Sequence, residues 1–287
     1  MNLFDHLVDE ALKNRNELSI LRIVVEKELL HHDILRILSK EGLLAGLTFM
    51  GGTCLRLCYG SNRLSEDLDF TGGADFSKKT LSHMAQTLTD SLATKYGLHV
   101  DVSQPKRGSG NVDTWVIKVQ TRPGRKEIPT QRINIDICAI PSYQSKPMVL
   151  LNPYGVEMGT SGLILLAESR EEIFADKIVA FTLRKNRIKY RDLWDMVWLH
   201  QNNIKLPIDL VFRKMKDHQY TSPNFLKLLN ARKTALKVSL EHKREFLHEM
   251  HRFLPAEGVE NTIEQSNYWE FLVNLIEDYC SLINKFT

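Results

Sequence analysis

Asp67 and Asp69 stand two positions apart in the stretch Asp-Leu-Asp-Phe that ends at Phe70. Residues two apart on a β-strand project from the same face, so the two carboxylates would point together while Leu68 and Phe70 point into a core. Two carboxylates held side by side repel each other unless a cation lies between them. Mg²⁺ suits such a pair because it binds a few carboxylates together with waters and substrate phosphates. The pattern predicts a site for Mg²⁺ or Mn²⁺.

Asp136 is the candidate third carboxylate, because it lies on the polar side of the alternating run 133–137, opposite the isoleucines. If this strand pairs beside the Asp67 strand, three carboxylates meet on one face of a sheet. The chemistry they suit is two-metal phosphoryl transfer, in which one ion activates an attacking hydroxyl and the other neutralises a triphosphate. Asp136 is also a candidate general base.

Gly51, Gly52 and Thr53 follow a short apolar run and precede a short predicted helix. Glycine lets the backbone approach a ligand closely, and backbone amides at the start of a helix bind phosphates. We therefore expect a nucleotide-binding turn here, with the Gly52 and Thr53 amides and the Thr53 hydroxyl on the terminal phosphates. An isolated Asp-x-Asp is usually a solvated loop. The 13 residues that separate it from a Gly-Gly-Thr turn make the combination far more specific.

Residues 49–56 and 63–70 together resemble the signature of the AbiEii/AbiGii toxin family, within the polymerase-beta-like nucleotidyltransferase superfamily. Two later stretches also fit: residues 171–178 resemble the family's lysine-bearing helix, and residues 187–195 its Arg-Asp-x-x-Asp helix. The resemblance runs from about residue 30 to 205. It implies a toxin of a type IV toxin–antitoxin or abortive-infection system, which transfers nucleotides from a nucleoside triphosphate to an acceptor, in some members the 3′ end of tRNA.

The resemblance also implies roles for residues in the second half of the chain. Lys177 would contact the triphosphate, Asp192 would support the active site, and Arg191 and Asp195 would assist. Without the family, Lys177 reads as a solvated lysine on an amphipathic helix, and the two aspartates as favourable acids in a first helical turn. One departure concerns Thr53, since some members have Gly-Ser at this place.

The elements that position these residues change in character near residue 160. Before it, helical and alternating apolar patterns are mixed; from about residue 171 the patterns are helical only. We predict an α/β (α+β) fold, with a nucleotidyltransferase domain over residues 1–160 and a helical domain over 161–287 that closes the cleft. His31 and His32 are neighbours in the predicted helix 17–40 and are expected at the surface. Cys54 and Cys58 are expected to be small core residues.

Charge is concentrated locally, although the net charge is only +3. Basic clusters occur at 106–107, at 122 with 125–126, and at 184–191, where five of eight residues are basic. The last cluster would attract RNA, and Tyr190 within it either stacks on a base or packs in the core. The start of the chain lacks a secretory pattern, and no apolar run reaches the ~20 residues of a membrane span. These features predict a cytoplasmic protein without a membrane partner.

The sequence thus favours a Mg²⁺-dependent nucleotidyltransferase that acts on RNA, with tRNA as the expected acceptor and a cognate antitoxin as partner. Two alternatives remain open. One is transfer to a small molecule or to a protein hydroxyl, although a cationic small molecule would favour an acidic rim. The other is a non-catalytic RNA-binding or partner-binding subunit, against which the complete set of candidate site residues argues.

Overall fold

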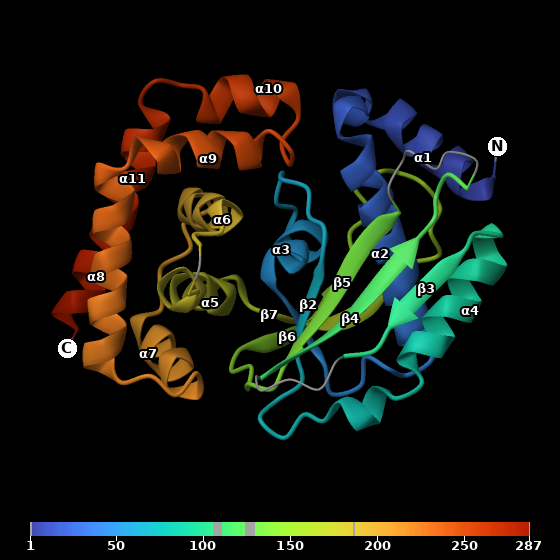
Figure 1. The fold of residues 1–287 in the computed structure, drawn as a ribbon, viewed down its shortest axis with the longest axis horizontal. Coiled ribbons are helices and arrows are strands. Elements are labelled where there is room, and N and C mark those ends of the chain that lie inside the picture. Colours follow the sequence, from blue (N-terminus) through green and yellow to red (C-terminus); the bar gives the residue numbers. More distant parts are fainter. Residues whose placement is uncertain (1, 106–110, 124–129, 186, 287) are drawn as a thin grey trace. The chain divides into compact units, whose positions relative to one another are not determined.

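The computed structural model describes residues 2–105, 111–123, 130–185 and 187–286. The chain divides into two compact units, Met1–Glu168 and Ser169–Thr287. The first unit holds a β-sheet with helices, and the second consists of helices (Figure 1). The last strand of the sheet ends at Glu168, which is why residues 161–168 lie in the first unit. No helix in the described parts of the chain is long and apolar enough to cross a membrane.

The sheet has seven strands in the order β3-β4-β5-β2-β1-β7-β6. Two neighbouring pairs, β2 with β5 and β1 with β7, are parallel, and the other pairs are antiparallel. This mixed sheet confirms the predicted α/β class. The strands are β1 Thr48–Met50, β2 Leu68–Thr71, β3 Val100–Ser103, β4 Val112–Val119, β5 Gln131–Cys138, β6 Ser145–Val149 and β7 Ile164–Glu168.

Alternation along the central strands separates an apolar face from a polar face. On β5 the isoleucines at 133, 135 and 137 are fully buried, whereas Asn134 and Asp136 between them are half-buried. Trp115, Ile117 and Val119 give β4 the same buried parity, as a half-buried strand requires. Helices α2 (Arg22–Lys40) and α4 (Met84–Tyr96) pack on this apolar side, against β5 and β3 (Figure 1). The polar face carries the candidate carboxylates.

Four further elements complete the described part of the first unit: α1 Leu3–Asn14, η1 Asn16–Leu21, α3 Gly51–Tyr59 and η2 Lys78–Leu81. The helix expected over 17–40 therefore begins as a 3-10 segment. The Ser19 hydroxyl donates to the carbonyl of Asn16, 2.6 Å away. A serine that bonds its own backbone competes with α-helical geometry, and the regular helix starts only at Arg22.

The prediction that His31 and His32 lie at the surface is wrong, since both side chains are fully buried. Helix α2 is enclosed around most of its circumference, and the polar residues on it have internal partners. The ring nitrogen Nε2 of His31 lies 3.0 Å from the Glu66 carbonyl, and Nδ1 of His32 lies 2.9 Å from the Thr160 hydroxyl. Cys54 and Cys58 are buried free thiols, as expected of core residues.

The second unit consists of helices in the described residues. They are α5 Arg170–Leu183, α6 Tyr190–Gln201, α7 Ile208–Asp217, α8 Ser222–Val238, α9 Leu240–Met250, α10 Ala256–Gly258, η3 Val259–Ile263 and α11 Tyr268–Lys285. The long helical pattern 224–254 breaks at Ser239, which separates α8 from α9. Aromatic rings fill the core: Trp194 and Phe246 each stack on Tyr268, with ring centroids 6.1 and 6.0 Å from it. Trp198 on α6 is half-buried.

Candidate active site

The start of helix α3 (Gly51–Tyr59) faces a carboxylate of the sheet. Strand β1 leads into α3 through Gly51, whose φ of +76° is unfavourable for residues with a side chain. In the antiparallel pair β1–β2, Met50 lies opposite Asp69. A Cβ added at Gly51 would stand 2.6 Å from Oδ2 of Asp69. The absence of a side chain at Gly51 is therefore what allows the Asp69 carboxylate to lie across the start of the helix.

Gly52 is adjacent to a buried cation that the sequence interpretation left without a role. A Cβ added at Gly52 would overlap the guanidinium of Arg63. Arg63 is only 3% exposed, and its Nη1 donates to the carbonyl of Leu64 at 3.0 Å. Gly52 has no positive φ, so its need for glycine is the space that Arg63 occupies. The sequence signal that could have indicated this close contact is the second glycine of the pair, Gly52.

The Thr53 side chain points into the protein, whereas the sequence had suggested that it faces a phosphate site. Its hydroxyl is buried, donates to the backbone carbonyl of Asp67 and lies 2.7 Å from Oγ of Ser65. The expected contact between this hydroxyl and terminal phosphates is therefore not what the structure shows, because the oxygen is engaged inside the protein. Thr53 instead fixes the backbone at Asp67. The amides of the first turn of α3 donate to no side-chain cap, and they remain the candidate phosphate ligands.

The three candidate carboxylates lie on the polar face of the two central parallel strands. Asp69 on β2 is paired in register with Asp136 on β5, and Asp67 immediately precedes β2. The predicted pairing of these two strands is thus confirmed. All three residues are half-buried. Oδ1 of Asp67 accepts from the Asn134 amide at 3.0 Å, and Oδ1 of Asp136 accepts from the Thr114 hydroxyl at 2.5 Å.

Carboxylate oxygens with partial access to solvent are the donors that Mg²⁺ prefers. The Asp69 carboxylate fills the space above Gly51. It therefore lies beside a helix start whose amides are suited to bind phosphate. Within the described residues, no three histidine, cysteine or acidic side chains already converge as a metal-binding group. Two of the three aspartates use one oxygen for the hydrogen bonds just named. The three aspartates fit a divalent ion in residue type and in their place on the sheet. Their carboxylates do not point toward a common centre in this structure.

A second charged cluster lies in the helical unit. Lys177 on α5 is 7% exposed, and its Nζ lies 2.6 Å from Asp192 and 2.8 Å from Asp195, both on α6. Arg184 also reaches Asp192, at 2.8 Å. Burial alone would raise the pKa of the Asp192 carboxyl, but the positive charges of Lys177, Lys189 and Arg184 hold that pKa well below its usual value. Lys177 is therefore a buried, ion-paired lysine rather than a solvated one.

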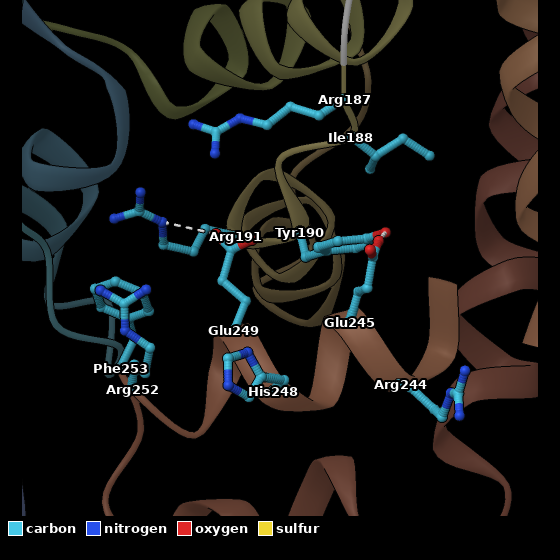
Figure 2. Close-up of a pocket in the computed structure, with 10 residues that line it drawn as sticks. All are labelled: Arg187, Ile188, Tyr190, Arg191, Arg244, Glu245, His248, Glu249, Arg252 and Phe253. Carbon is cyan, nitrogen blue, oxygen red and sulfur yellow. Dashed lines mark hydrogen bonds and ion pairs between the residues drawn. The ribbon is translucent and has the colours of Figure 1, made fainter. Parts of the chain in front are cut away.

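Arg191 lines a groove of about 440 Å³ within the helical unit, between the start of α6 and helix α9 (Figure 2). Its Nε lies 3.0 Å from Glu249, and its guanidinium stacks 4.3 Å above the Phe253 ring. Three further arginines line the groove: Arg187, Arg244 and Arg252. Figure 2 shows the side chains of Arg187, Arg191 and Arg252 extending toward the same side.

Tyr190 in this segment is a core residue, since it is 5% exposed and its hydroxyl bonds Glu245 and His242. Of the three basic clusters, residues 106–107, 125–126 and Asn186 lie outside the described residues. The structure therefore places two pieces of the expected site. One is the Gly51–Asp69–Asp136 group in the first unit, and the other is the Lys177–Asp192 group in the second.

Comparison with known proteins identifies the relatives of this chain. Residues 33–271 match the family model described as nucleotidyl transferase AbiEii toxin, type IV TA system. No curated protein matches. The fold is similar to MenT4, a nucleotidyltransferase toxin of Mycobacterium tuberculosis H37Rv, with 17% identity, coverage of 96% of this chain and 98% of that chain, and a TM-score of 0.59.

Two structures from Helicobacter pylori share the fold. JHP933 is 18% identical over 91% of this chain and 92% of its own, with a TM-score of 0.50. A chain titled putative nucleotidyltransferase is 16% identical over 91% and 98%, also with a TM-score of 0.50. The matched residues extend over both units and include the two charged groups. The chain belongs to the AbiEii family of nucleotidyltransferase toxins of type IV toxin–antitoxin systems.

Proposed function

We propose that this nucleotidyltransferase moves a nucleoside monophosphate from a nucleoside triphosphate to RNA, with tRNA as the acceptor, in a reaction that requires Mg²⁺. The observation that carries the proposal is the register of Asp69 with Asp136, beside the Gly51 turn. This arrangement brings carboxylates and helix-terminal amides to one place, as transfer between a triphosphate and a hydroxyl requires. Family membership implies the triphosphate substrate and a cognate antitoxin.

Each residue of the first unit has a distinct task in this proposal. The first-turn amides of α3 bind the terminal phosphates, and Asp67, Asp69 and Asp136 hold the divalent ion. When bound, Mg²⁺ supplies positive charge against the triphosphate and the leaving pyrophosphate. The acceptor oxygen forms a bond to the α-phosphorus as the bond from that phosphorus to pyrophosphate breaks. The proton of the acceptor hydroxyl passes to the Asp136 carboxylate, which the Thr114 hydroxyl holds in position.

The charge of the helical unit supports RNA as the acceptor. The groove lined by Arg187, Arg191, Arg244 and Arg252 also contains two glutamates, which leaves an excess of positive charge. Arginine binds phosphate in a bidentate manner and stacks on planar rings. A surface of this kind attracts a polyanion and makes its binding sensitive to salt. In the same unit, Lys177 is proposed to contact the triphosphate, and Asp192 and Asp195 hold its Nζ in position.

The test is incubation of the pure protein with Mg²⁺, total tRNA and each α-labelled nucleoside triphosphate in turn. We expect label in tRNA, its loss on chelation of the metal, and its loss in Asp69→Asn. The matched control is Asp90→Asn on α4, an exposed carboxylate on the opposite side of the sheet, which should transfer label normally. Label on the protein itself would point to a protein acceptor. Absence of both label and nucleotide binding would favour a non-catalytic subunit.

A further inference from the structure

A hollow of about 450 Å³ lies on the polar face of the sheet, within the same unit as the three aspartates. Its size falls in the range of pockets that hold small ligands, ~300–1,000 Å³. It is formed by β3, the start of the following loop, β4 and β5. The residues that matter here are Ser103, Val112, Thr114, Val116, Lys118 and Arg132.

The strand register fixes where this hollow begins relative to Asp136. In the antiparallel pair β4–β5, Thr114 lies directly opposite Asp136, and Lys118 lies opposite Arg132. Thr114 both lines the hollow and donates its hydroxyl to Oδ1 of Asp136. Four residues along a strand span ~13 Å. Along β4 the hollow therefore runs from Val112 past Thr114, which bonds the candidate general base, to a pair of cations about that far from Thr114.

The two cations at the far end have weak internal partners. Nζ of Lys118 lies 4.0 Å from Asp101, and Nε of Arg132 lies 3.4 Å from the Asn134 side chain. Both side chains are exposed. Contacts this long between exposed groups contribute little to stability, so the positive charge remains available to an anionic ligand. Arginine and lysine together on one face are typical phosphate ligands.

The floor of the hollow is apolar, although it lies on the polar face. Val112 is 50% exposed and Val116 is half-buried, and both project from the same face of β4 as Thr114 and Lys118. Val116 lies between the Thr114 hydroxyl and the two cations, where it offers contact to the flat face of a sugar or base, and Val112 extends the apolar surface on the other side of Thr114. From Asp136 toward Arg132, the hollow thus presents a proton acceptor, then an apolar surface, then positive charge. The 3′ end of an RNA strand has the matching order: a 3′ hydroxyl, the terminal nucleoside and the phosphates that precede it.

We propose that this hollow is the acceptor subsite and binds the 3′-terminal nucleotides of an RNA single strand. The 3′ hydroxyl lies at Asp136, the last nucleoside rests on Val116, and the backbone phosphates contact Lys118 and Arg132. The inference rests on the proposed transfer to RNA and adds the location of the acceptor. A nucleoside triphosphate is bound elsewhere, at the start of α3.

The experiment compares the double variant Lys118→Ala/Arg132→Ala with the intact chain in the tRNA-labelling assay. We expect the KM for tRNA to rise at least tenfold while the KM for the nucleoside triphosphate stays unchanged. Loss of two single-strand phosphate contacts should also lower the slope of log KM for tRNA against log salt by ~1.4. Lys118→Arg/Arg132→Lys should restore the KM for tRNA. Val116→Glu, which adds an anion to the floor, should raise it as well.

The matched control is Lys13→Ala/Lys40→Ala, which removes two exposed positive charges from α1 and α2. An equal rise of the tRNA KM in this control would overturn the proposal, because net charge alone would explain the effect. An unchanged tRNA KM in the Lys118/Arg132 variant would also overturn it, as would equal changes in both KM values. Failure of the intact protein to label tRNA would instead refute the proposed function, so the two failures are distinguishable.

Discussion

Substitution of Gly51 by alanine tests the geometry at the start of α3 most directly. The new Cβ would stand 2.6 Å from Oδ2 of Asp69, whereas ordinary contacts begin at 3.4 Å. The carboxylate must therefore move by about 0.8 Å, or the helix start must move away from it. Since a misplacement of ~1 Å at a reacting centre reduces the rate by about 10²-fold, we expect nucleotide transfer by Gly51→Ala to fall about a hundredfold.

The same substitution also affects stability through the backbone. Gly51 has a φ of +76°, and a residue with a Cβ in this left-handed region costs ~1–2 kcal/mol. For a chain of this size, such a cost lowers Tm by only a few degrees. The variant should therefore remain folded at 25 °C, and its loss of activity should exceed what unfolding explains.

Gly162→Ala is the matched control for this prediction. Its φ is +73°, and no atom lies within 4 Å of the position that its Cβ would occupy. It should show the same loss of Tm as Gly51→Ala and full transfer activity. Thermal unfolding and single-turnover labelling of tRNA measure both quantities. Full activity in Gly51→Ala would refute the claim that the placement of the Asp69 carboxylate at this turn is required.

Four other predictions follow from the described contacts. Lys177→Met leaves its buried aspartates without their lysine and should lower the unfolding free energy by ~3–5 kcal/mol in urea; an unchanged value would contradict the ion-paired geometry. Thr114→Val removes the bond to Asp136 and should lower kcat ~10–100-fold with an unchanged KM for the triphosphate. Burial lowers the pKa of His32 to about 4 from 6.5, so stability is full above pH 6.5 and falls by ~3 kcal/mol toward pH 4; His32→Gln should lack this loss. Calorimetric nucleotide binding should require Mg²⁺ in the intact protein and lose that requirement in Asp69→Asn.

The sequence indicated which side chains share one face of a strand, but it did not indicate which strands lie side by side. The alternation of isoleucine with polar residues on β5 is a local pattern, and it assigned Asp136 to the polar face. The parallel pairing of Asp136 with Asp69 joins segments that are far apart in the sequence, and nothing local encodes that register. From the sequence, this pairing could be stated only as the condition under which the three carboxylates meet.

Side chains that act inside the protein were harder to predict than those that face solvent. Thr53 was expected to contact phosphate because a hydroxyl follows the glycine turn, yet its partners, Ser65 and the Asp67 carbonyl, come from a later loop. His31 and His32 were misplaced because neighbouring polar residues suggest an exposed helix face. A helix enclosed on several sides buries such residues when each finds a partner.

The helices after residue 205 illustrate a different limit. No motif was recognised there, but the family model extends to residue 271. Helical packing residues such as Phe246 and Tyr268 are interchangeable with other large apolar residues. Such residues form no short signature that can be recognised in the sequence.

The proposed need for a divalent cation rests on the groups that share the start of α3. A helix N-terminus attracts negative charge, and in this structure the Asp69 carboxylate already lies beside it, above Gly51. A triphosphate that binds the same amides would bring its own negative charge next to that carboxylate, and two such anions repel each other unless a cation lies between them. In this proposal, Gly51 leaves space for the Asp69 carboxylate, and nucleotide binding therefore depends on metal binding. Without the ion, the phosphates and the carboxylate would repel each other at this position.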